Sequence, residues 1–188
     1  PDARSAAPTL LQLMQDRSNS ANFRVLRKMA PEMADKVIPI LLARLADPNP
    51  DRRAAAARLL AEAGAAAHAP LVAFLAQSLK EGNRTALLGA LEVFQQMDRL
   101  NHNLPNPSLL SAGLQEARLT DRIVVNDPAV HAGLIRLLED TDVELRRGAV
   151  CALGVLGGQV RPALPALNKL ASQDPDWKTR GYATRAIR

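Results

Sequence analysis

Aromatic residues are scarce in this chain of 188 residues and make up only 3% of it. A β-sandwich needs aromatic and β-branched residues to fill its pleated faces. The hydrophobic fraction of 47% consists instead mainly of Ala, Leu, Val and Ile, and Ala and Leu are good helix formers. Small side chains also let helices approach one another closely. The composition therefore favours stacked helices over a β-sandwich.

Cysteines and long apolar runs are also lacking. Cys151 is the one cysteine in the sequence, so no intrachain disulfide can form. No run of about 18 or more apolar residues occurs, so we expect no membrane span. No signal peptide is apparent, and we expect a cytoplasmic protein. Because the chain begins at Pro1, a processed leader or a larger parent polypeptide remains open.

Motifs for metal binding and catalysis are missing as well. The three histidines, His68, His102 and His131, are not followed by Glu and do not pair at a spacing of four. A helical metal site needs such a spacing, which places two ligands on one face. Neither a glycine-rich phosphate loop nor a Gly-x-Ser-x-Gly motif is present. The sequence predicts no metal site, no cofactor and no enzyme activity.

The positive charge is concentrated towards the C-terminal end. The net charge is +5, and from Leu145 onward eight basic residues accompany two acidic ones. The first 144 residues are nearly balanced, with 16 basic and 17 acidic residues. A basic end can meet nucleic acid, an anionic surface or an acidic protein, and composition alone leaves these alternatives open.

A repeat with a period of 31 residues is the main pattern in the sequence. Pro8, Pro39 and Pro70 share this spacing, and later units have Ala132 and Pro165 in the same place. An Asp follows this position by eight or nine residues in most units, and an Arg comes six residues after the Asp. These markers are Asp16, Asp47, Arg53, Arg84, Asp140, Arg146, Asp174 and Arg180. Two units depart from the pattern, with Asn22 in the Arg place and Ser78 in the Asp place.

Apolar residues recur at i, i+3 and i+4 on both sides of the markers, which predicts two helices in each unit. The Asp and Ser residues between the helices suit N-caps, because their side-chain oxygens accept from free backbone N–H groups. Gly64 and Gly157 stand where the second helix of a unit should end. We expect a single domain of five units, approximately at residues 4–33, 35–64, 67–97, 128–157 and 161–188.

Residues 98–127 interrupt the repeat. They contain two prolines and several asparagines, which disfavour a continued helix. Arg84 and Arg146 are 62 residues apart, twice the period, so a degenerate repeat could be hidden between them. We expect an insertion that projects from the stack or caps an edge, with one short helix near residues 108–118.

The order Pro, Asp and Arg, with a helix on either side, resembles the HEAT repeat. The segments LARLADPNPDRRAAAARLLAEAG and LLEDTDVELRRGAVCALGVLGG are similar in particular to the bacterial lyase-type variant of HEAT repeats. The resemblance covers most of the chain outside residues 98–127. It implies an all-α fold, a right-handed superhelix or solenoid of about five HEAT-like repeats.

The resemblance also implies roles for the repeated side chains. The repeated Arg of HEAT-like proteins reaches a turn Asp of its own or an adjacent unit, so the markers given above are expected to form a structural Asp/Arg ladder. Second helices of HEAT-like units line a concave groove. Residues at two positions of these helices are therefore expected to face the groove and bind a partner: Arg27, Arg58, Arg147, Cys151 and Arg185. A solvated charged face without a partner is the alternative interpretation.

The hypothesis that follows is a non-catalytic interaction module or scaffold that binds an acidic protein or peptide on its concave face. Arginine forks would select for carboxylates. Nucleic-acid binding is the alternative, although aromatics for stacking on bases are few and do not cluster in one unit. A subunit of a chromophore-lyase-like enzyme is a second alternative that only the family resemblance implies.

Overall fold

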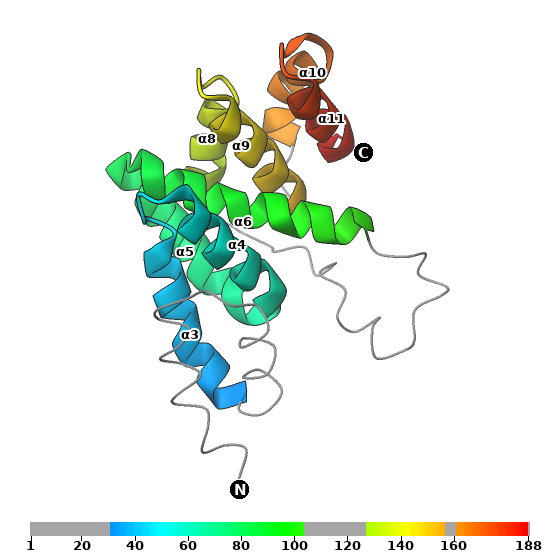
Figure 1. The fold of residues 1–188 in the computed structure, drawn as a ribbon. Coiled ribbons are helices and arrows are strands. Elements are labelled where there is room, and N and C mark those ends of the chain that lie inside the picture. The colour runs from blue at the N-terminus through cyan, green and yellow to red at the C-terminus, as the bar shows by residue number, and fades with distance from the viewer. Residues whose placement is uncertain (1–30, 104–126, 157–160, 188) are drawn as a thin grey trace, which may run out of the picture.

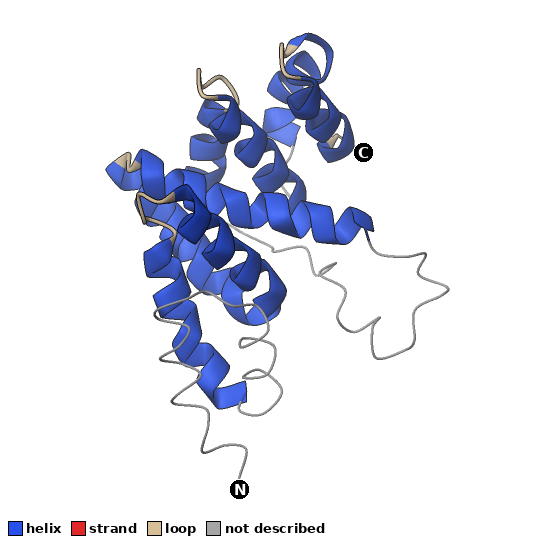
Figure 2. Ribbon diagram, in the orientation of Figure 1, coloured by secondary structure: helices blue, strands red, loops and turns tan. Residues whose placement is uncertain are grey.

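Eight α-helices and one 3₁₀ helix make up the part of the chain that the computed structural model describes, residues 31–103, 127–156 and 161–187 (Figures 1 and 2). No strand occurs within these ranges. The predicted all-α fold is therefore confirmed. Residues 4–30 of the predicted unit 4–33, with Asp16 and Arg27, and the short helix near 108–118 lie outside the described residues. Residues 31–33, assigned to the end of that unit, begin the helix of the next one.

The helices follow one another as four antiparallel pairs, each a first and a second helix (Figure 1). The last pair is preceded by the 3₁₀ helix η3, Arg161–Ala163. The pairs are α3 (Pro31–Arg44) with α4 (Pro50–Ala63), α5 (Ala65–Glu81) with α6 (Arg84–Asn103), α8 (Pro128–Leu137) with α9 (Val143–Leu156), and α10 (Leu164–Gln173) with α11 (Trp177–Ala186).

Local sequence explains where the second helices begin. Asn49 accepts hydrogen bonds from the N–H groups of Asp51 and Arg52 at the start of α4. Asp176 caps α11 in the same way by accepting from the N–H of Thr179. Pro50 is the first residue of α4, where a missing N–H group costs no helical hydrogen bond.

Helix α6 is longer than the sequence predicts. It has 20 residues, against 14 in α4 and in α9, and it continues six residues beyond the predicted unit end at residue 97. The first part of the predicted interruption, residues 98–103, is thus helical. Further along, α6 packs directly against α9, and α5 contacts α8. The pairs on either side of residues 104–126 are therefore immediate neighbours in the stack.

The second helices form a continuous layer. Helix α4 packs on α6, α6 on α9, and α9 on α11, with a core of Leu, Ala and Val around Phe94 and Met97. The first helices α8 and α10 make few contacts with each other. Among the other first helices, α3 contacts α5 and α5 contacts α8. We call the surface made by α4, α6, α9 and α11 the second-helix face.

Two glycines of the second helices permit close approaches to the preceding unit. A Cβ atom added at Gly89 of α6 would lie 2.1 Å from the carbonyl oxygen of Leu45, just after α3. One added at Gly148 of α9 would lie 2.4 Å from the Cβ of Leu91 in α6. Glycine at these positions therefore sets the distance between neighbouring units.

None of the described helices is both long and apolar enough to cross a membrane.

Candidate interaction surface

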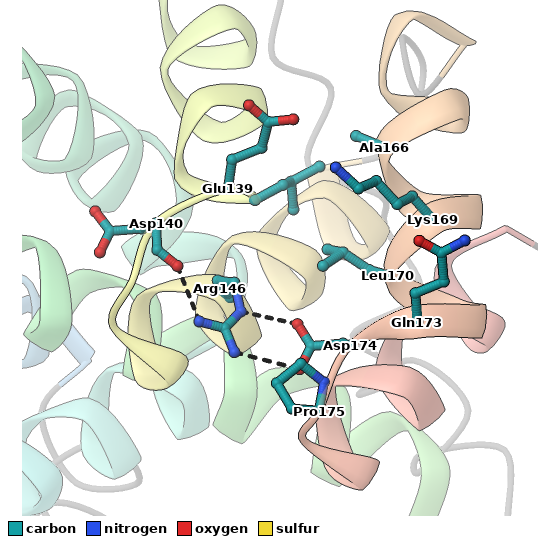
Figure 3. Close-up of a pocket in the computed structure, with 10 residues that line it drawn as sticks. Glu139, Asp140, Arg146, Ala166, Lys169, Leu170, Gln173, Asp174 and Pro175 are labelled. Carbon is teal, nitrogen blue, oxygen red and sulfur yellow. Dashed lines mark hydrogen bonds and ion pairs between the residues drawn. The ribbon is translucent and has the colours of Figure 1, made fainter.

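Arg146 of α9 joins the last two pairs at their turns (Figure 3). Its Nε and Nη2 atoms donate to the carboxylate of Asp174 at 2.8 and 3.2 Å. Its Nη1 atom donates to the carbonyl oxygens of Asp140 and Thr141 at 2.9 and 3.0 Å. Only 12% of the Arg146 side chain and 2% of the Asp174 side chain are exposed. The hydrogen bond that Arg146 donates to Asp174 raises the pKa of Arg146, which stays charged.

Arg53 and Arg180 occupy the same helical position as Arg146, the fourth residue of a second helix. Each donates from Nη1 to two carbonyl oxygens of its own turn. The distances are 2.8 and 3.0 Å for Arg53 and 2.7 and 3.2 Å for Arg180. The Nε atom of Arg53 is buried without a hydrogen-bond partner, whereas the same atom of Arg146 has Asp174. The contact between units is therefore strongest at Arg146.

Arg84 is placed differently from the other three arginines. It is the first residue of α6, its side chain is 56% exposed, and it reaches forward to the carboxylate of Asp140 at 3.1 and 3.2 Å. This bond lowers the pKa of Asp140. Only Gly82 and Asn83 join α5 to α6, and Gly82 has a left-handed φ of 65° that permits the tight turn. Because this turn is short, equal spacing in sequence does not give an equal position in the fold.

Arg147 lies at the interface between α9 and α11 instead of facing an open groove. Its Nε and Nη2 atoms donate to the carboxylate of Asp176 at 2.8 and 2.7 Å, and Nη1 donates to Glu144. Both side chains of the Arg147–Asp176 pair are 16% exposed. Hydrogen bonding from Arg147 holds the pKa of Asp176 well below its usual range. This arginine links α9 to the start of α11.

Cys151 is buried, although the sequence interpretation expected it to face the groove. Its exposure is 3%, and it lies in the core beside the Asp98–Arg185 pair. Gly89, which follows Arg84 by five residues as Cys151 follows Arg146, is buried too, and it packs against Leu45. Burial raises the pKa of the Cys151 thiol well above its usual range. A protonated, buried thiol is a poor nucleophile.

We expect Cys151 to resist thiol reagents in the folded protein. Burial keeps Ellman's reagent away from the sulfur atom. Because the pKa of the thiol is also raised, the reactive thiolate is scarcely populated at neutral pH. Mixing the native protein with the reagent should give almost no absorbance change, and adding denaturant should release one equivalent per chain. Rapid stoichiometric reaction of the native protein would contradict the buried placement.

A cleft of about 260 Å³ lies between the C-terminal part of α6 and α11. We call it the α6–α11 cleft. The Nη2 atom of Arg185 donates to Asp98 at 2.7 Å, and its guanidinium lies 4.6 Å from the centre of the Tyr182 ring. The cleft is lined mainly by Asp98, Arg99, Trp177, Lys178, Tyr182 and Arg185. It thus brings Trp177 and Tyr182 together, contrary to the expectation that the aromatics do not cluster.

Arg58 of α4 is exposed on the same second-helix face, in the first described pair. Glu92 of α6 is half-buried, and the nearby positive charges of Arg58 and Arg99 act to lower its pKa. Burial is the main cause of its raised pKa, and the nearby carboxylate of Glu144 acts in the same direction. The exposed cations on this face are therefore interrupted by carboxylates.

A second groove, of about 520 Å³, opens between the turn after α8 and helix α10, beside the Arg146–Asp174 pair. Leu138 and Leu170 contribute apolar surface, and Glu139 and Lys169 stand at its sides (Figure 3). Because acidic and basic side chains both line this groove, neither sign of charge dominates in it.

In the part of the chain that the structure describes, no group of three or more His, Cys, Asp or Glu side chains could hold a metal ion.

Helical pairs that stack through their second helices, with arginines binding the turns, define this protein as an all-helical repeat protein. Residues 37–64, which span most of α3 and α4, match the family model described as HEAT repeat. This match supports the resemblance to HEAT repeats and places one such repeat at α3 and α4. HEAT repeats commonly mediate protein interactions and are typically non-catalytic scaffolds. Neither a curated protein nor a solved structure matches the chain.

Proposed function

We propose that this helical repeat protein is a non-catalytic interaction module that binds an acidic protein or peptide on its second-helix face. The observation that carries the proposal is the division of its arginines into two groups. Arg146 and Arg147 are used within the fold. Other cations keep exposed side chains on the second helices α4, α6 and α11, and Arg185 does so despite its pair with Asp98. These cations are Arg58, Arg99, Lys178 and Arg185.

An acidic protein segment suits this surface better than nucleic acid does. A duplex that follows the second helices would carry its continuous phosphates past Glu92 and Glu144, where like charges repel. Part of the basic C-terminal charge is also neutralised internally, since Asp174 and Asp176 bind Arg146 and Arg147. A peptide can place its carboxylates only where cations stand, and arginine forks bind carboxylates well.

Fluorescence anisotropy of a labelled oligoglutamate peptide, at physiological ionic strength, tests the proposal. We expect saturable binding that Arg58→Glu weakens by about fivefold, the effect of replacing a surface attraction by a repulsion. Lys80→Glu is the matched control, because it reverses an exposed charge on the first helix α5 and should leave binding unchanged. A random DNA duplex that binds more tightly than the peptide, and is weakened by Arg58→Glu, would overturn the proposal in favour of nucleic acid.

A further inference from the structure

The α6–α11 cleft contains an apolar side chain that the fold leaves uncovered. Trp177, the one tryptophan of the chain, is the first residue of α11 and is 68% exposed. The Lys178 ammonium lies 5.7 Å from the centre of its ring. Exposed tryptophans beside cations are frequent anchors of protein interfaces, because the indole offers a large area at little entropic cost. This position therefore fits an apolar side chain of a partner.

The charges around the indole are mostly positive. Arg99, Lys178 and Arg185 line the cleft, and Asp98 is the acidic residue among its lining side chains. Asp98 binds Arg185, whose side chain is still 39% exposed. The carboxylate of Asp98 therefore already binds the arginine that a carboxylate of a partner could bind. The intramolecular pair shows the chemistry of ligand that the cleft accepts.

The size of the cleft limits what can enter it. About 260 Å³ is below the range of roughly 300–1,000 Å³ that is usual for small-molecule pockets. It has room for a few side chains of a peptide lying across α6 and α11. An extended polyanion would meet Glu92 and Glu144 on the neighbouring second-helix surface.

We propose that the α6–α11 cleft is the docking site for a short acidic peptide segment, in which an apolar side chain packs on Trp177 and a carboxylate displaces Asp98 from Arg185. The inference rests on the proposed function and assigns the partner's anchor to one place on the second-helix face. Asp98 then acts as an internal competitor of the ligand, which lowers its affinity in the resting protein.

The test titrates the full chain with an oligoglutamate peptide that carries one central leucine. Because the peptide has no tryptophan, the emission of Trp177 should shift to shorter wavelength as the indole is covered. Trp177→Ala should weaken binding about tenfold, as expected of an interface anchor, when followed through a fluorescein label. Asp98→Asn should tighten binding about threefold by removing the competing charge. Lys169→Glu, on α10 beside the other groove, should change nothing.

The outcomes separate this inference from the proposed function. Peptide binding that Arg58→Glu weakens, with no emission shift and no effect of Trp177→Ala or Asp98→Asn, would refute the cleft alone. Absence of binding by any acidic peptide would refute both proposals. Tighter binding of oligothymidylate than of the peptide, lost in Trp177→Ala, would assign the cleft to single-stranded nucleic acid and overturn the inference. Circular dichroism of each variant checks that it is folded.

Discussion

Arg146→Ala is expected to destabilise the folded chain by about 3–5 kcal/mol, the usual cost of removing one partner of a buried ion pair. The carboxylate of Asp174, of which 2% is exposed, would lose the guanidinium that neutralises it. Two carbonyl oxygens of the Asp140–Thr141 turn would lose their donor as well. Urea unfolding followed by circular dichroism measures the change as a shift in midpoint at an unaltered slope.

Arg53→Ala is the matched control for this expectation. Arg53 occupies the same helical position and binds two turn carbonyls, but no carboxylate accepts from its Nε atom. Its removal should cost only about 1–3 kcal/mol, the penalty of unsatisfied neutral groups. Equal costs at both positions would show that Asp174 contributes nothing beyond the turn carbonyls, and would contradict the assignment of the Arg146–Asp174 pair as the strongest contact between units.

Gly89→Ala is expected to destabilise the chain by about 3 kcal/mol, although alanine is the better helix former. The added methyl group would stand 2.1 Å from the carbonyl oxygen of Leu45, and backbone atoms cannot rotate out of the way. The two helical pairs would have to separate, which loosens the core around them. A fall in the thermal midpoint, measured by circular dichroism, is the expected result.

Gly181→Ala tests the same substitution where space is open. Nothing lies within 4 Å of a Cβ atom added at Gly181 of α11. The variant should gain about 0.5–1 kcal/mol in stability, because alanine restricts the unfolded chain and favours the helix. If Gly89→Ala were equally stabilising, α6 could not approach Leu45 as closely as described.

Much of the repeat architecture could be predicted from the sequence because it depends on local patterns. Apolar residues at helical spacing give the helices, and capping residues such as Asn49 and Asp176 mark their beginnings. The position of Arg84 could not be predicted, since the 31-residue spacing hides a shorter turn at Gly82. The neighbouring residues Gly82 and Asn83, both common in turns, were the signal in the sequence for that turn.

The surface residues of the second helices and the α6–α11 cleft were harder to predict from the sequence, for a different reason. Arg58 and Cys151 share a helical position, yet only the first is exposed, because exposure depends on which neighbouring helix covers that position. The α6–α11 cleft depends on Asp98, which the sequence interpretation assigned to an insertion. Trp177 and Tyr182, together on a polar helix with Arg185, were the signal that this end of the stack has its own surface.

The extra length of α6 changes how the stack should fold. In an ideal repeat protein each unit contacts only its neighbours, so unfolding can spread one unit at a time from an end. The ion pair between Asp98 and Arg185 connects units that are separated by the α8–α9 pair. Such a contact ties the last pair to the end of α6, so fraying of the last pair must also break this ion pair. We therefore expect the three C-terminal pairs to unfold more cooperatively than a stack with contacts between neighbours alone.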